Sequence, residues 1–244
     1  MESTSTAPPG VPAGKSASPP DTTARPPWRA LTGVLGLFFG ILLTVVLIML
    51  VGGIYVAVGF DDPSDAASFD FVAIAVQSIA LVGVALALTS RMSPPTPAQF
   101  GFRRPKSSVI GPTLIAFFGY LVVAYVYALI ANPAKDDLPQ ELGADQSTSL
   151  AIITGIFVIG VAPFVEEFFF RGFLYQSFRN EIGVWPGAIV SGMIFGGIHF
   201  KPEYFVPLSA LGILLAWLFE KTGSLWPCIA VHAINNTLAF AVLL

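Results

Sequence analysis

Long apolar runs constrain this chain more than any other feature of its sequence. Of its 244 residues, 55% are hydrophobic and only 11% are charged, and the mean hydropathy is +0.76. A soluble domain carries about twice that charged fraction, and a helix needs roughly 20 apolar residues to cross a bilayer. We therefore expect an all-α fold, a polytopic transmembrane helix bundle with about seven spans, within a range of six to eight.

The seven candidate spans differ in length. Those beginning at Trp185 and Tyr204 are short enough to be tilted, broken or re-entrant. All seven together make the chain an integral, multi-pass protein of the lipid bilayer, which we expect in the plasma membrane. The candidates are Leu31–Gly59, Phe71–Thr89, Val109–Ala131, Leu150–Phe178, Trp185–Phe200, Tyr204–Phe219 and Leu225–Leu244.

Composition divides the chain into three parts. Residues 1–28 are rich in Pro, Ser, Thr and Ala and cannot bury enough apolar surface to fold, so we predict a disordered N-terminal tail. Residues 29–148 form scaffold helices with almost no ionisable groups inside their spans, and residues 149–244 contain such groups. The net charge of −3 offers no basic stripe for nucleic acid, and the single cysteine, Cys228, excludes an intrachain disulfide.

Lys and Arg fall mainly on one side of the predicted membrane. Nine lie on the side of the N-terminal tail and two on the other, where the loops are acidic. Cytoplasmic loops carry the excess of Lys and Arg, so we expect a cytoplasmic N-terminus. The nine are Lys15, Arg25, Arg29, Arg91, Arg103, Arg104, Lys106, Arg179 and Lys221; the two are Lys135 and Lys201; the acids are Asp61, Asp62, Asp65, Asp136, Asp137, Glu141 and Asp145.

Three ionisable residues stand together inside the fourth apolar segment. An ionisable group within a span costs about 2.5–3.5 kcal/mol and therefore indicates function. Glu167 and Arg171 are four residues apart on one helix face and can neutralise each other. Glu166 points about 100° away and is left over as a candidate base. Pro163, just before them, predicts a kink or a restart of the helix.

Both histidines of the chain lie in the same apolar half. His199 follows Phe195 by four residues, and His232 shares a helix face with Asn236. Helical rise places Glu166 and His199 about 25 Å from the turn near Ile182, but His232 only about 12 Å past its own turn, a disagreement of about half a membrane. Small residues at Ala188, Gly192 and Gly196 form a ridge that favours close helix packing.

These motifs, Glu-Glu-x-x-x-Arg, Phe-x-x-x-His and His-x-x-x-Asn, resemble those of the CAAX-protease and bacteriocin-processing family of intramembrane glutamic endopeptidases. The resemblance covers about Ala162–Asn236. It implies a helical bundle with a water-accessible cavity, peptide hydrolysis without a metal or other cofactor, and a peptide or protein substrate, in some members lipidated. It assigns catalysis to Glu166, His199, His232 and Asn236, and supporting roles to Glu167, Arg171 and Phe195. Glu166 and His199 would activate water, and His232 with Asn236 would stabilise the oxyanion.

Other readings of the same residues remain open. Glu166, His199 and His232 could hold zinc with one open position, although the usual His-Glu-x-x-His spacing is absent. Cys228 precedes His232 by four residues and could form a thiolate–imidazole pair. A third reading is of another class: a proton-coupled transporter, or a non-catalytic membrane binding or immunity protein, that uses the same Glu/His cluster.

Overall fold

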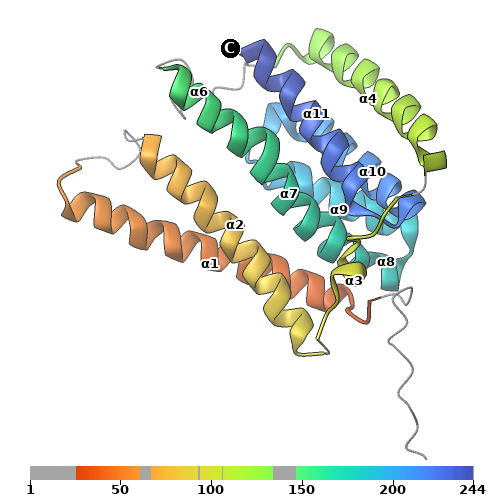
Figure 1. Cartoon of the computed structure of the whole chain (residues 1–244), viewed down its shortest axis with the longest axis horizontal. Helices are drawn as coiled ribbons and strands as arrows, with labels where there is room; N and C mark the ends of the chain where they lie inside the picture. The colour runs from red at the N-terminus through yellow and green to blue at the C-terminus, as the bar shows by residue number, and fades with distance from the viewer. Residues whose placement is uncertain (1–25, 61–66, 93, 106, 134–146, 244) are drawn as a thin grey trace, which may run out of the picture.

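The computed structural model describes residues 26–60, 67–92, 94–105, 107–133 and 147–243, and within them the chain is helical without a strand. The predicted all-α fold is confirmed (Figure 1). The helices are α1 (Ala30–Ala57), α2 (Ala67–Ser90), α3 (Pro97–Phe100), η2 (Ser107–Val109), α4 (Ile110–Ala131), α6 (Thr148–Gly155), η3 (Ile156–Val161), α7 (Ala162–Glu167), η4 (Phe168–Tyr175), α8 (Gln176–Ile182), α9 (Val184–Gly197), η5 (Pro202–Tyr204), α10 (Phe205–Thr222) and α11 (Leu225–Leu243).

Five helical segments in the described ranges are long and apolar enough to cross a membrane. The predicted segment at Trp185 falls in the shorter helix α9, and the last predicted segment falls in the 19-residue helix α11. Large apolar side chains cover the outer faces of the bundle, as lipid-facing helices require; Ile130 of α4 is 81% exposed. The five are Ala30–Ala57, Ser68–Ser90, Ile110–Ala131, Thr148–Ile182 and Pro202–Thr222.

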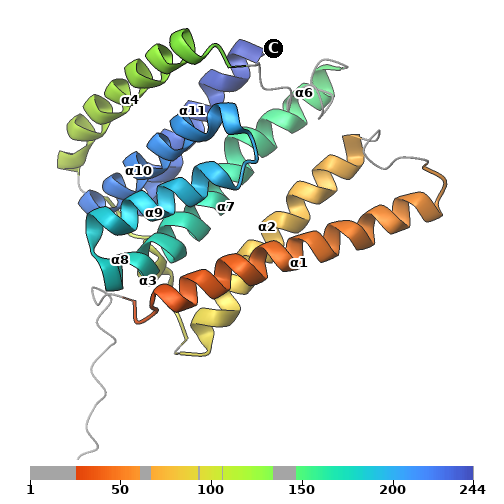
Figure 2. The ribbon, with the colours of Figure 1, turned by 180° about the vertical axis from the view of Figure 1, so that it is seen from behind.

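The helices are arranged around a central group formed by residues 148–243. Helices α1 and α2 make an antiparallel hairpin that meets this group at the end near α3 and α8 (Figure 1). Helix α4 lies on the opposite flank, against α10 (Figure 2). The residues that sequence singled out thus belong to the middle of the bundle.

Pro26, the first described residue, already contacts the helices. The side-chain amide of Asn180 in α8 donates to the carbonyls of Pro26 and Trp28, each at 2.9 Å, and the Trp28 ring stacks on Phe100 at 5.1 Å. Trp28 is therefore buried, at 1% exposure. The rest of the predicted disordered tail, residues 1–25, lies outside the described residues.

Six of the described basic residues belong to the end of the bundle where α1 begins and α2, α8 and α10 end (Figure 1), whereas Arg171 is buried in the middle and Lys201 lies between α9 and α10. The six are Arg29, Arg91, Arg103, Arg104, Arg179 and Lys221. Which compartment this end faces stays a prediction. The other residues used for it lie outside the described ranges: Lys15, Arg25, Asp61, Asp62, Asp65, Lys106, Lys135, Asp136, Asp137, Glu141 and Asp145.

One helix runs without a break from Thr148 to Ile182, and the predicted restart at Pro163 is wrong. The backbone before the proline stays helical, with φ −70° and ψ −50° at Val161. The turns of η3 just before it are wider, with π-type hydrogen bonding. A proline removes a hydrogen bond and crowds the preceding turn, and a π-bulge accommodates both effects inside a continuous helix.

Helices α9 and α10 approach through the predicted ridge of small residues. A Cβ atom added to Gly212 would lie 2.7 Å from the Gly192 Cα, and one added to Gly196 would lie 2.8 Å from the Phe205 carbonyl oxygen. Ala188, the third member of the ridge, is fully buried. Close backbone contact of this kind needs residues without bulky side chains.

We predict that Gly192→Ala lowers the melting temperature of the detergent-solubilised protein. Its new methyl group would lie 2.8 Å from the Ile213 backbone nitrogen, so the helices must separate, and overpacking typically costs about 1–3 kcal/mol. Gly83→Ala in α2 is the matched control, because nothing lies within 4 Å of its added Cβ. Equal melting temperatures for the two variants would show that glycine does not set the α9–α10 spacing.

Candidate active site

A buried carboxylate joins the long helix Thr148–Ile182 to α11. Arg171 Nη1 donates to Glu167 Oε1 at 2.7 Å, which confirms the predicted pair. His232 of α11 donates from Nδ1 to the same oxygen at 2.8 Å. The side chains of Glu167 and Arg171 are 0% and 2% exposed, and that of His232 is 4% exposed. The pair is therefore not self-contained, since Glu167 also fixes the ring orientation of His232.

Arg171 has two further contacts that hold its charge in the interior. Its Nη2 donates to the Gly212 carbonyl at 3.2 Å, and its guanidinium lies over the Phe195 ring, 4.6 Å from the centroid. A cation over an aromatic face is stabilised by the ring quadrupole. The carbonyl is within reach because the glycine contacts bring α10 close to α9.

Glu166 has a different environment from its neighbour. Its side chain is 22% exposed, and its Oε2 lies 3.8 Å from His232 Nε2. That distance is too long for a direct hydrogen bond but suits a bridging water. Within the described residues, Oε2 has no hydrogen-bond partner. The predicted division holds in geometry: Glu167 is committed to partners, and one oxygen of Glu166 is left over.

The predicted depth mismatch between His232 and Glu166 is wrong, because α11 begins beside the long helix well before that helix ends at Ile182. The Leu225 side chain, at the start of α11, lies 3.5 Å from where a Cβ atom on Gly172 would stand, and Gly172 lies ten residues, or about 15 Å of helix, before Ile182. His232 follows Leu225 by seven residues, and Glu167 precedes Gly172 by five, so the two meet at one depth.

The segment around α3 holds the α10–α11 turn through two main-chain carbonyls. The Gly101 carbonyl accepts from the Leu225 backbone N–H at 2.8 Å, and the Arg103 carbonyl accepts from Ser224 Oγ at 2.6 Å. Sequence analysis missed this segment. Its available signals were the Thr96–Gln99 capping box and Gly101, whose φ of +101° marks the end of a short helix.

His199 lies in the turn after α9, on the other side of an aromatic ring. The Phe195 ring is 4.9 Å from the His199 ring and 5.6 Å from the His232 ring, both edge to face. His199 Nδ1 donates to the Phe195 carbonyl at 2.7 Å, since a carbonyl can only accept. Its Nε2 is then free to face a ligand. In the described part of the chain, His199 makes no ion pair with either glutamate.

Asn236 is tied to the helix that carries the glutamates. Its amide donates to the Val158 carbonyl in η3 at 2.9 Å. A π-bulge leaves main-chain groups without their usual helical partners, and this contact satisfies one. One amide hydrogen of Asn236 remains for another acceptor.

In the described ranges, the structure shows neither the Cys228–His232 pair nor a zinc-binding arrangement of Glu166, His199 and His232. The Cys228 thiol is fully buried and lies 3.4 Å from the Leu215 carbonyl, and no thiol–imidazole contact with His232 occurs there. Among those residues, no three His, Cys, Asp or Glu side chains converge as a metal cluster.

The comparisons with known proteins point to one family. Residues 148–238 match the family described as "Type II CAAX prenyl endopeptidase Rce1-like". This part of the chain is similar to that family. All the motif residues, from Glu166 to Asn236, fall inside the Rce1-like region, and the family is one of membrane proteases.

Several curated proteins share part of the chain. "Putative membrane peptidase YdiL" of Bacillus subtilis (strain 168) is 27% identical over 77 residues, which cover 32% of each chain. An Escherichia coli protein, "Uncharacterized 24.3 kDa protein", is 25% identical over 135 residues, covering 53% of this chain and 60% of its own. YpbD of Bacillus subtilis is 32% identical over 83 residues, covering 32% of this chain and 40% of its own. The chain thus spans between about a third and three fifths of these relatives, and no solved structure matches it.

We predict that Glu167→Gln lowers the melting temperature of the Rce1-like region more than Glu166→Gln does. Removing one partner of a buried ion pair strands the other and costs about 3–5 kcal/mol. The glutamine oxygen can still accept a hydrogen bond from His232. The fall in melting temperature therefore reports the Arg171 charge that is left without a carboxylate. Adding Arg171→Met should recover much of the loss.

Melting curves of the four proteins in one detergent decide this prediction. Glu166→Gln is the matched control, because Glu166 Oε2 has no partner to lose. The prediction would be wrong if Glu166→Gln lowered the melting temperature more than Glu167→Gln and the double variant showed no recovery. Glu166 would then be the structural carboxylate and Glu167 the candidate base.

Proposed function

We propose that the protein is a membrane-embedded endopeptidase of the glutamic type, in which Glu166 activates a water molecule. One observation carries the proposal: a buried oxygen of the partly exposed Glu166 side chain, without a hydrogen-bond partner among the described residues, lies 3.8 Å from a histidine nitrogen, and a second carboxylate orients that histidine. The match to a protease family supports the same reaction class.

The proposed step begins with a water between Glu166 and His232. The Glu166 carboxylate takes a proton from this water as its oxygen attacks the carbonyl carbon of the scissile peptide bond. A tetrahedral intermediate with an oxyanion forms. When it collapses, the C–N bond breaks and the proton on Glu166 passes to the leaving amine. His232 holds the water through Nε2, because Nδ1 is committed to Glu167.

This assignment changes one expected role. The resemblance gave the water-orienting role to His199 and the oxyanion role to His232 with Asn236. The 3.8 Å contact favours His232 as the partner of Glu166 at the water. We assign oxyanion stabilisation to His199 Nε2, when protonated, and to the remaining amide hydrogen of Asn236. Preorganised donors of this kind typically contribute 10²–10³-fold, which is about 2.7–4 kcal/mol.

The substrate class is proposed from where the site lies. Glu166 sits within the long apolar helix Thr148–Ile182, which suits a substrate that is itself associated with the membrane. A membrane-associated peptide or protein, lipidated or not, fits that description. A transporter or binding protein that uses the same cluster would bind without producing new termini, which separates it from a peptidase.

We predict that Glu166→Gln abolishes cleavage while the protein still inserts and accumulates. Glutamine cannot accept the proton of water, and loss of a general base typically costs about 10²–10⁴-fold in rate. Cells would express the wild-type chain, Glu166→Gln or the control Glu181→Gln, and new N-termini would be identified in their membranes. Among the described residues, Glu181 pairs with Arg29 alone, and Arg29 is 74% exposed, so the loss of this pair should have little effect.

The expected result is a set of N-termini present with wild type and Glu181→Gln and absent with Glu166→Gln. The same termini from the Glu166→Gln membranes would refute the glutamate mechanism. No new termini from wild-type membranes, with all three chains inserted, would favour the binding or transport reading.

A further prediction separates the metal-free reaction from the zinc alternative. If Glu166 and His232 activate water alone, extensive chelation of the purified protein should leave the rate of peptide cleavage unchanged. The rate would be measured before chelation, after it, and after zinc is added back. If the cleavage rate fell on chelation and recovered when zinc was added, Glu166, His199 and His232 would be reassigned as metal ligands.

A further inference from the structure

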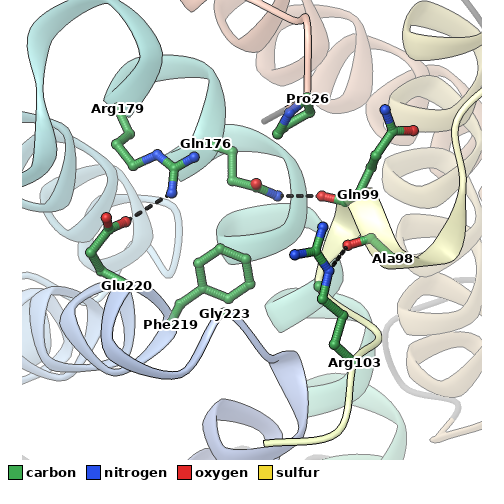
Figure 3. A pocket seen from close by; sticks show the side chains of 10 residues that line it. Pro26, Ala98, Gln99, Arg103, Gln176, Arg179, Phe219, Glu220 and Gly223 are labelled. Carbon is green, nitrogen blue, oxygen red and sulfur yellow. Dashed lines mark hydrogen bonds and ion pairs between the residues drawn. The ribbon is translucent and has the colours of Figure 1, made fainter. Parts of the chain in front are cut away.

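A polar cavity of about 220 Å³ lies at the basic end of the bundle, apart from Glu166. It opens among α3, α8 and the end of α10 (Figure 3). Arg103 and Arg179 enter it from different elements, and their guanidinium groups point toward its middle. Gln176, whose amide donates to the Gln99 carbonyl, forms part of its wall. The candidate active site does not use these residues.

Both arginines keep donors that the protein does not use. Arg103 donates only through Nε, to the Ala98 carbonyl at 2.7 Å, and its two terminal nitrogens have no partner in the described part of the chain. Arg179 Nη1 pairs with Glu220 at 2.9 Å. Its Nε is buried and, among the described residues, lacks a hydrogen-bond partner. A buried unsatisfied donor is rare in proteins and indicates a missing acceptor.

The charge of the cavity favours an anion. Glu220, the one acid among its lining residues, already accepts from Arg179 and from the Tyr175 hydroxyl at 3.0 Å. Arg103 is therefore uncompensated by the cavity wall. Lys221 lies exposed beside it and raises the local potential further. Guanidinium forks bind phosphate oxygens in bidentate fashion.

The position of the cavity indicates where such an anion comes from. It is built from the ends of membrane helices, where α8 and α10 finish and the chain enters α1. Lipid headgroups lie at this level of a bilayer, and basic pockets between helix ends bind anionic headgroups.

We propose that this cavity is a phosphate-binding site, occupied by the headgroup phosphate of an anionic lipid or by free phosphate. Arg103 supplies the terminal nitrogens, and Arg179 supplies Nε. The site links the segment around α3 to α8 and α10, so a bound phosphate would reinforce the cap below the α10–α11 turn.

Native mass spectrometry of the full chain in detergent tests the site. Phosphatidylglycerol would be titrated against phosphatidylcholine with the same acyl chains, for wild type, Arg103→Gln and Arg104→Gln. We expect selective phosphatidylglycerol binding to wild type, weakened about tenfold by Arg103→Gln, the scale of one charge-assisted contact. Arg104→Gln is the matched control, because Arg104 is exposed and does not line the cavity, and should leave binding within about twofold.

A second pair of variants keeps the test independent of Arg103, whose loss also removes its bond to Ala98. Gly223 lines the cavity with φ +62°, and nothing lies within 4 Å of an added Cβ. Asn and Asp both tolerate this left-handed conformation and have nearly the same shape. Gly223→Asp should therefore weaken phosphatidylglycerol binding about tenfold, while Gly223→Asn should not.

A parallel melting experiment with inorganic phosphate, against chloride at equal ionic strength, distinguishes the two sources. Stabilisation of wild type but not of Arg103→Gln by inorganic phosphate assigns the site to free phosphate. Its absence, with selective lipid binding retained, assigns the site to a headgroup. The proposal would be overturned if the Arg103 and Arg104 variants had equal effects, or if the two Gly223 variants had equal effects. It would also be overturned if wild type responded neither to phosphatidylglycerol nor to inorganic phosphate.

Discussion

The carboxylate of Glu167 is the interaction on which the centre of this protein depends. One of its oxygens accepts from Arg171 on its own helix and from His232 on α11. An isolated buried charge in a bundle interior would cost several kcal/mol, so these partners have to remain together. The network therefore sets the depth of α11 relative to the long helix, and with it the position of His232 beside Glu166.

Close helix packing makes the network possible. Arg171 reaches the Gly212 carbonyl only because α10 lies against α9 without side chains between them at Gly192 and Gly212. The Phe195 ring fills the remaining space, with the guanidinium on its face and the two histidines on its edge. Packing and charge neutralisation thus depend on the same few residues.

The scaffold also fixes the turn that carries α11 inward. The segment around α3 supplies main-chain carbonyls to the turn at Ser224 and Leu225, and Phe102 packs on Phe168 and Trp226 at ring distances of 6.2 and 5.9 Å. A turn buried at this depth needs such partners, because unsatisfied backbone groups are costly away from water. The segment around α3 thus holds the turn from which α11 carries His232 toward Glu167.

The sequence by itself determined the helical class, most of the segments that form helices, and the ionisable residues that lie inside apolar helices. Apolar runs of span length and the rarity of ionisable residues are local properties, so Glu166, Glu167, Arg171, His199 and His232 could be identified without a structure. The i,i+4 pair and the glycine ridge follow from helical geometry alone and were predicted correctly. Tertiary structure decided what these residues touch. The burial of the turn at Ser224 and the choice of His232 as the partner of both glutamates depend on contacts between segments more than 60 residues apart. Helical rise and periodicity describe one helix at a time, and they contain no information on how deep the next helix begins.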